Sequence, residues 1–117
     1  MRLSHELRDR TKGYASRVIR FYVSLPRNRK EVDVLGRQLL RSGTSVAAHV
    51  REASRARSTA EFVSKVEGAL QEADESRLWL ELLNEDCGID NNVLRFLLRE
   101  ADELMAIFAT MAHKIKL

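Results

Sequence analysis

The sequence is poor in the residues that interrupt regular structure. Its 117 residues include a single proline, Pro26, and only five glycines. A sheet protein of this length needs many turns, and turns are built largely from these two residue types. Their shortage argues against β-sandwiches and barrels and favours a protein built from a few long helices.

The sequence also lacks the means to form an internal disulfide or to cross a membrane. Cys87 is its one cysteine, so no internal disulfide is possible. No apolar run approaches the roughly 18 residues of a membrane span. The first residues, MRLSHELRDRTK, are charged where a secretory signal would be apolar. We therefore expect a cytoplasmic protein without a membrane partner.

The residue patterns of common catalytic and metal sites are missing as well. The sequence contains no Glu-x-x-His pair of the di-iron type, no zinc-ligand spacing and no phosphate-binding glycine loop. His49-Val-Arg-Glu52 has the reversed spacing without a second copy, and it indicates a surface pair of side chains. Cys87 has no base beside it in the sequence, so it fits a buried thiol better than a nucleophile. The sequence thus predicts no enzyme activity, no metal site and no cofactor.

Apolar residues recur at every third or fourth position in four segments, as they do along one face of a helix. The first segment runs from about Leu3 to Leu25 and is ended by Pro26. The second begins near Glu31, and its apolar stripe continues through the small residues of RSGTSVAAHV, positions 41–50. Both segments are therefore predicted to be helices of more than twenty residues.

Local signals mark the ends of the other two helices. Ser58 and Glu61 form a capping box, in which each side chain satisfies a free backbone N–H of the third helix. Gly88 supplies the stop of that helix, and Asp90 is the expected N-cap of the fourth. Four long helices with short connections predict an all-α protein, a single domain over residues 1–117 folded as an antiparallel up-down-up-down four-helix bundle.

Small residues on the second helix need a physical reason, because glycine costs about 1 kcal/mol in a helix relative to alanine. Gly36, Gly43 and Ala47 fall on one flank of the apolar stripe. Close approach of a neighbouring helix would explain them. An anion site is the weaker interpretation, because amide groups in the middle of a helix are already hydrogen-bonded.

Charge is distributed unevenly along the chain. Residues 1–30 hold nine Lys/Arg and two Asp/Glu, whereas residues 58–87 hold two and eight. The basic surplus is either a solvated face, or a phosphate-binding face, or a partner for the acidic third helix of a neighbouring subunit. The candidate nucleic-acid contacts are Arg10, Lys12, Arg17, Arg20, Arg27, Arg37 and Arg41. Aromatic residues for stacking on bases are missing from this face of the helical wheels, so any binding should depend on charge or shape.

Several large apolar side chains point away from the core stripes on a helical wheel. The candidate oligomer-interface residues are Leu78, Trp79, Leu82, Phe96 and Ile107. A set of exposed large apolar side chains indicates an interaction surface. The competing interpretation is that the bundle geometry differs from the wheel and that some of them are internal.

Two stretches carry a resemblance to a known family. RTKGYASRVIRFYVSLPR and LLRSGTSVAAHVREASRARSTAEFVSKVEGALQEADESRLWLELL resemble the first helix and the signature of the four-helix bundle proteins encoded in intervening sequences of bacterial 23S ribosomal RNA genes. The resemblance spans roughly residues 7–115. Members often have Gly-Ala-Asn where this chain has Ala47-Ala48-His49, so the packing around His49 is expected to differ.

The resemblance implies a ring-shaped homopentamer. It also implies kinship with accessory variability proteins of diversity-generating retroelements, whose basic barrels bind nucleic acid and a reverse transcriptase. The family has no agreed catalytic residues to carry over. Two functions therefore remain open, namely a non-catalytic oligomeric accessory protein that binds RNA or DNA, and an oligomeric scaffold that works through protein partners alone.

Overall fold

Four helices account for most of the chain. The computed structural model describes residues 3–116, and its helices are α1 (His5–Ser24), α2 (Lys30–Ser54), α3 (Thr59–Glu85) and α4 (Asn92–Lys116). Their bounds lie within a few residues of the four predicted segments, and the described residues contain no strand. The prediction of an all-α four-helix structure is confirmed.

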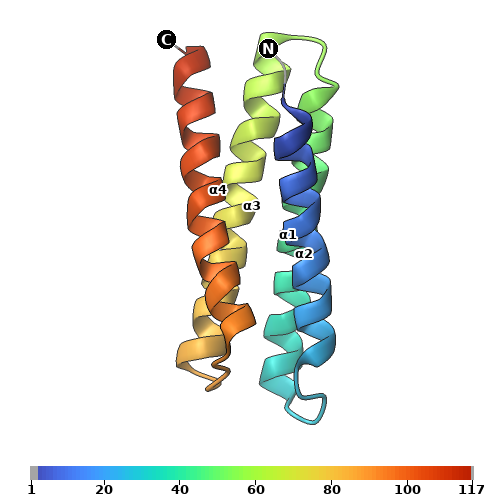
Figure 1. Cartoon of the computed structure of the whole chain (residues 1–117), viewed down its shortest axis with the longest axis vertical. Helices are drawn as coiled ribbons and strands as arrows, with labels where there is room; N and C mark the ends of the chain where they lie inside the picture. The colour runs from blue at the N-terminus through green and yellow to red at the C-terminus, as the bar shows by residue number, and fades with distance from the viewer. Residues whose placement is uncertain (1–2, 117) are drawn as a thin grey trace.

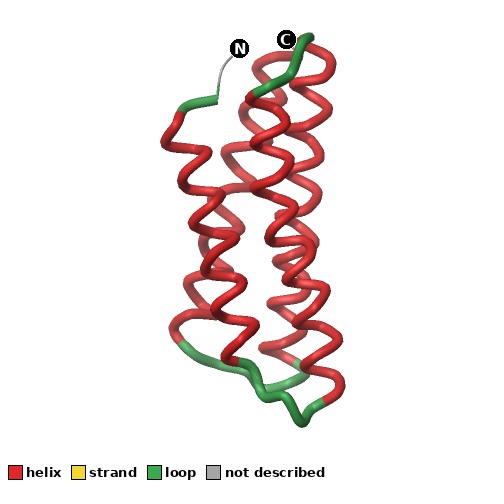
Figure 2. Tube along the Cα trace, turned by 90° about the vertical axis from the view of Figure 1, so that its right-hand side faces the viewer, coloured by secondary structure: helices red, strands yellow, loops and turns green. Residues whose placement is uncertain are grey.

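The helices lie side by side in a long, narrow body of 46 × 20 × 20 Å. Figure 1 shows the α1–α2 and α3–α4 connections at one end, and the α2–α3 connection with both ends of the chain at the other. The chain direction thus reverses from each helix to the next, and Figure 2 shows the same arrangement from the side. Helices adjacent in sequence pack together, and α1 packs most loosely against α4. The α2–α3 seam and the α1–α4 seam therefore lie on opposite sides of the bundle.

Local capping explains where α3 begins and ends. The hydroxyl oxygen of Ser58 accepts a hydrogen bond from the backbone N–H of Glu61 at 3.1 Å, which confirms the predicted start. At the other end Gly88 has a φ of 73°, in the left-handed region that favours glycine. This turn lets the N–H of Ile89 donate to the carbonyl of Leu83 at 3.0 Å and so close the helix end.

The predicted cap of α4 is wrong by one residue. The side-chain oxygen of Asn91, rather than that of Asp90, accepts from the N–H of Leu94 at 2.9 Å. Asp90 instead forms an ion pair with Arg95. Aspartate and asparagine are equally good N-caps. Which of Asp90 and Asn91 caps α4 therefore depends on the path of the chain after the turn at Gly88.

The core is a continuous apolar column between the four helices, and it is formed by the predicted stripes. Its largest fully buried side chains are Tyr14, Val18, Phe21, Val32, Leu39, Val46, Leu80, Leu83, Leu94, Leu97, Leu104 and Phe108. A hydrogen bond from the Tyr14 hydroxyl to Ser76 Oγ, at 2.9 Å, crosses this column. Burial raises the pKa of Tyr14 to about 12, so the hydroxyl stays protonated and able to donate at neutral pH.

Glycines set the distance between α1 and α2. A Cβ added at Gly43 would lie 2.9 Å from both methyl carbons of Val18, and one at Gly36 would lie 2.9 Å from Cδ1 of Tyr22. Real Cβ atoms do not approach other carbons so closely. The small flank of α2 is therefore explained by close packing on α1, as the first interpretation predicted.

We expect Gly43→Ala to destabilise the bundle by about 1–3 kcal/mol, because the added methyl overpacks the α1–α2 contact. Gly13 of α1 is the matched control, since a Cβ there meets nothing within 4 Å. Gly13→Ala should stabilise the helix by about 0.5–1 kcal/mol through propensity alone. Urea unfolding followed by circular dichroism measures both. Equal stabilisation by the two substitutions would contradict the close approach of α1.

Candidate nucleic-acid and assembly surfaces

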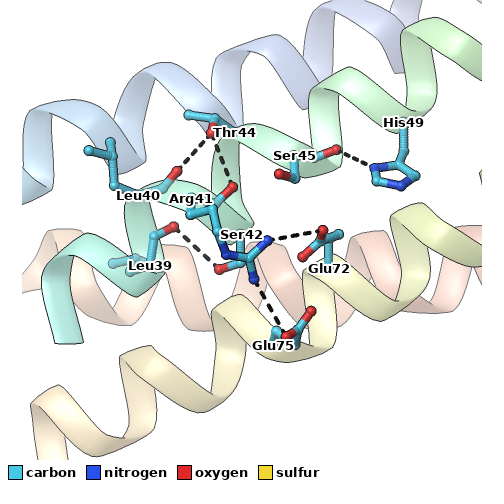
Figure 3. Close-up of polar contacts among 9 residues, drawn as sticks. All are labelled: Leu39, Leu40, Arg41, Ser42, Thr44, Ser45, His49, Glu72 and Glu75. Carbon is cyan, nitrogen blue, oxygen red and sulfur yellow. Dashed lines mark hydrogen bonds and ion pairs between the residues drawn. The ribbon is translucent and has the colours of Figure 1, made fainter. Parts of the chain in front are cut away.

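The polar side chains of the small-residue stretch are bonded to their own helix. Figure 3 shows that the Ser42 hydroxyl donates to the Leu39 carbonyl at 3.3 Å and the Thr44 hydroxyl to the Leu40 carbonyl at 2.8 Å. Ser42 is also completely buried. These hydroxyls are occupied within α2, so this stretch serves packing and offers no anion site of its own.

His49 has a packing role that the sequence did not predict. Its Nδ1 donates to the Ser45 carbonyl at 2.9 Å, because a carbonyl oxygen can only accept. The ring lies against Gly68 of α3, where a Cβ would come within 2.8 Å of Nε2. Glu52, the predicted partner of His49, instead pairs with Lys65 at 3.3 Å. The predicted His49–Glu52 surface pair is therefore wrong, and Gly68 is the residue that makes room for the imidazole.

Arg41 joins α2 to α3 inside the same chain. Its guanidinium lies 3.3 Å from a carboxylate oxygen of Glu72 and 3.5 Å from one of Glu75 (Figure 3). The two carboxyl groups also face each other, and the hydrogen bond with Glu72 raises the pKa of Glu75 above its ordinary value. The positive charge of Arg41 is thus neutralised by carboxylates within the α2–α3 seam.

Arg10 joins α1 to α4 in a comparable way. It donates from Nε and Nη2 to the two carboxylate oxygens of Glu100, both at 2.7 Å, and from Nη2 to Glu103 at 3.0 Å. This bidentate hydrogen bond to Glu100 raises the pKa of Arg10 further above its already high value. Since Glu100 is largely buried, Arg10 acts here as a structural link.

Two more predicted nucleic-acid contacts are engaged at the surface. The Arg17 guanidinium lies 4.4 Å from the centroid of the Phe96 ring, in a cation–π contact across the α1–α4 seam. Arg37 pairs with Asp33 one turn earlier on α2, at 3.0 Å. Together with Arg10 and Arg41, four of the seven candidate cations thus have partners within the chain.

The remaining three candidates, Lys12, Arg20 and Arg27, are exposed. Among the described residues none of them forms an ion pair. Lys12 of α1 lines a shallow groove together with Arg51 of α2 and with Arg55, the C-cap of that helix. Arg51 and Arg55 are not among the seven candidate contacts, and they lie together at the C-terminal end of α2.

The five predicted interface residues separate into two groups. Leu78, Trp79 and Leu82 belong to α3. Trp79 and Leu82 are half-buried and lie two turns after Glu72 and Glu75, the residues that pair with Arg41 of α2. Leu78 stands beside them and is 45% exposed. Phe96 and Ile107 belong to α4 and fall on the side that faces α1, where both are half-buried. Trp79, Phe96 and Ile107 also pack against the core. The interpretation that bundle geometry makes some of these side chains partly internal is therefore correct for those three.

The first group extends onto α2. Contacts along the seam pair Glu52 with Lys65 and Arg41 with Glu75, so the start of α2 lies opposite the end of α3. Val34, two helical turns before Arg41, is 51% exposed on the same face of α2. We call this surface the α2–α3 patch. It comprises Val34, Leu35, Leu78, Trp79 and Leu82.

The second group lines hollows along the α1–α4 seam, which we call the α1–α4 groove. Ile107 borders a hollow of about 440 Å³ with Leu3, Leu7 and Met111. Phe96 borders a smaller one of about 220 Å³ near Arg17. The bridge from Arg10 to Glu100 divides the two hollows. The molecule therefore has two different, partly apolar surfaces on opposite sides.

Comparison with known proteins identifies the family. A family model described as 23S rRNA-intervening sequence protein matches residues 5–110. The chain belongs to this family. Its structure is similar to the crystal structure of a protein with unknown function from the S23 ribosomal protein family of Bacteroides thetaiotaomicron, with a TM-score of 0.81 and 33% sequence identity. That similarity covers 90% of this chain and 96% of the other. A search of curated proteins gives no significant match.

Neither a metal centre nor a membrane span is found in the described part of this 23S rRNA-intervening sequence protein. No three His, Cys, Asp or Glu side chains among residues 3–116 gather in a geometry that would hold a metal ion. In the same range, no helix combines the length and the apolar character that are needed to cross a bilayer. The functional question therefore concerns the charged and apolar surfaces of the bundle.

Proposed function

We propose that this member of the 23S rRNA-intervening sequence family is a non-catalytic, cytoplasmic oligomer that binds RNA or DNA through phosphates as an accessory factor. The observation that carries the proposal is the division of charge across the bundle. Residues 1–30 contain nine Lys/Arg against two Asp/Glu, and residues 58–87 contain two against eight. The α1–α2 side is therefore basic and the α3 side acidic.

The basic side keeps free cations even after the internal ion pairs are counted. Lys12, Arg20 and Arg27 are exposed and, in the part of the chain that the structure describes, have no carboxylate partner. Cations of this kind attract a polyanion and release its condensed counterions, which gives affinity without sequence preference. No aromatic side chain lines the hollow beside Lys12, which favours contact with phosphates over stacking on bases at that position.

Assembly as an antiparallel bundle in a ring is supported by the position of the two apolar surfaces. A head-to-tail ring needs two different surfaces on each subunit, so that one surface of a subunit meets the other surface of the next. The α2–α3 patch and the α1–α4 groove lie on opposite sides of the bundle, as such a contact requires. The family resemblance favours five subunits. The α1–α2 face would then remain uncovered in every subunit.

A scaffold that binds only protein partners is the second candidate. It is favoured by the fact that Arg10, Arg37 and Arg41 already have carboxylate partners within the chain. In that case the basic surplus would serve the fold and assembly. The resemblance makes a reverse transcriptase the first protein partner to test.

We expect Val34→Arg combined with Leu78→Arg to dissociate the oligomer, because two charges would be buried in the subunit contact. Both side chains are about half exposed in the single chain, so the helical fold should persist. Ile19→Arg with Val23→Arg is the matched control, since these α1 residues are similarly exposed and belong neither to the α2–α3 patch nor to the lining of the α1–α4 groove. Multi-angle light scattering gives the mass of each. A monomeric wild-type protein at micromolar concentration would contradict assembly.

Nucleic-acid binding is tested by fluorescence anisotropy with labelled single-stranded RNA, structured RNA and duplex DNA. Affinity should fall with salt by about 0.7–0.9 log units per phosphate contact per log unit of salt. Arg20→Glu combined with Arg27→Glu should weaken binding to all three probes alike, because phosphate contacts carry no sequence information. If the wild-type protein binds none of them in about 50 mM salt, the scaffold function replaces this proposal.

A further inference from the structure

A shallow groove crosses the α1–α2 face beside the small residues of α2. It has a volume of about 450 Å³ and is lined by Lys12, Ala47, Ala48, Arg51, Glu52 and Arg55. The hollow exists because Ala47 and Ala48 leave open the space between the cations that longer side chains would fill. The close approach of α1 at Gly43 brings Lys12 to the edge of this floor.

The groove carries a net positive charge that the chain itself does not neutralise. Lys12, Arg51 and Arg55 are exposed, and within residues 3–116 their side chains form no ion pair. Glu52 is the one carboxylate in the lining, and it is held by Lys65 of α3 at 3.3 Å. Three cations therefore face a groove in which the only negative charge is already paired.

A further cation lies one turn along α1 from this groove. Arg8 lines a neighbouring hollow with His5 and with Ser54, the residue next to Arg55. The Nε of Arg8 is buried without a hydrogen-bond partner among the described residues. The basic track thus continues from Arg51 and Lys12 toward the end of the bundle where α2 meets α3.

The chemistry of the groove fits a phosphate backbone better than bases. No aromatic side chain lines it, so bases have nothing to stack on. Arg51 lies in the last turn of α2 and Arg55 is the C-cap of that helix, so both cations stand at the same end of the groove and can contact phosphates of one backbone. Ala47 and Ala48 are small and apolar. They let a nucleic-acid strand lie close to α2, and they do not compete for the hydrogen bonds of its phosphates.

We propose that the groove of Lys12, Arg51 and Arg55 is the principal contact of this protein with the phosphate backbone of a nucleic acid. This inference rests on the proposed nucleic-acid function, and it adds Arg51 and Arg55 to Lys12, which is one of the seven candidate contacts. Both apolar surfaces lie on other sides of the bundle, so the groove stays open in each subunit of a ring. Each subunit would contribute one groove to a continuous basic track.

The test compares Arg51→Gln combined with Arg55→Gln against a charge-matched control, Arg99→Gln combined with Lys114→Gln. The control residues are exposed on α4 and have no ion-pair partner in the described part of the chain. Glutamine keeps the helix propensity and removes the charge. Anisotropy of fluorescein-labelled oligouridylate is measured for the full-length oligomer between about 50 and 200 mM salt. Circular dichroism and light scattering confirm that fold and assembly are unchanged.

Loss of two phosphate contacts should make the slope of log affinity against log salt shallower by about 1.4 or more. The control slope should equal that of the wild type. An unchanged slope in the groove variant, with binding weakened by Arg20→Glu and Arg27→Glu, would overturn the groove but leave the proposed function standing. No wild-type binding at all would overturn the proposed function itself. Displacement of the RNA by polyglutamate at equal charge concentration would assign the groove to acidic proteins and overturn the inference.

Discussion

The contact between α1 and α2 determines much of the rest of the structure. Gly43 and Gly36 lack a Cβ, which allows Val18 and Tyr22 to pack directly against the backbone of α2. Helix packing is dense and short-ranged, so a methyl group at this contact would push α1 outward. With α1 held against α2, its opposite side packs loosely on α4 and leaves the hollows of the α1–α4 groove. The same contact sets Lys12 beside the cations of α2.

Electrostatics then distinguishes the seams from the open faces. Arg10 is neutralised by Glu100 across the α1–α4 seam, and Arg41 by Glu72 across the α2–α3 seam. Such pairs orient helices and satisfy buried carboxylates more than they attract a distant ligand. Cations on the α1–α2 face have no acidic helix within reach, because the acidic α3 packs on the other side of α2. Lys12, Arg51 and Arg55 therefore keep their charge unneutralised on one face of the bundle.

The sequence was informative about the fold because periodicity and capping are local properties. Pro26, Ser58 and Gly88 mark helix ends through backbone chemistry that does not depend on distant residues. The adjacent Asp90 and Asn91 are chemically equivalent caps, so the choice between them was not predictable. The composition of the candidate surfaces depends on which helices are neighbours and on how each helix is rotated about its own axis. For that reason the sequence did not show that four candidate cations are engaged, that Phe96 and Ile107 share a seam apart from Leu78, or that Arg51 and Arg55 meet Lys12.

The central claim is that the α1–α2 face binds the nucleic acid while the rest of the bundle does not. Lysine acetylation followed by mass spectrometry tests it directly, because Lys12 lies in the groove and Lys114 on α4. Adding oligouridylate at low salt should slow acetylation of Lys12 several-fold and leave the rate at Lys114 unchanged. Protection of Lys114 with no protection of Lys12 would contradict the account.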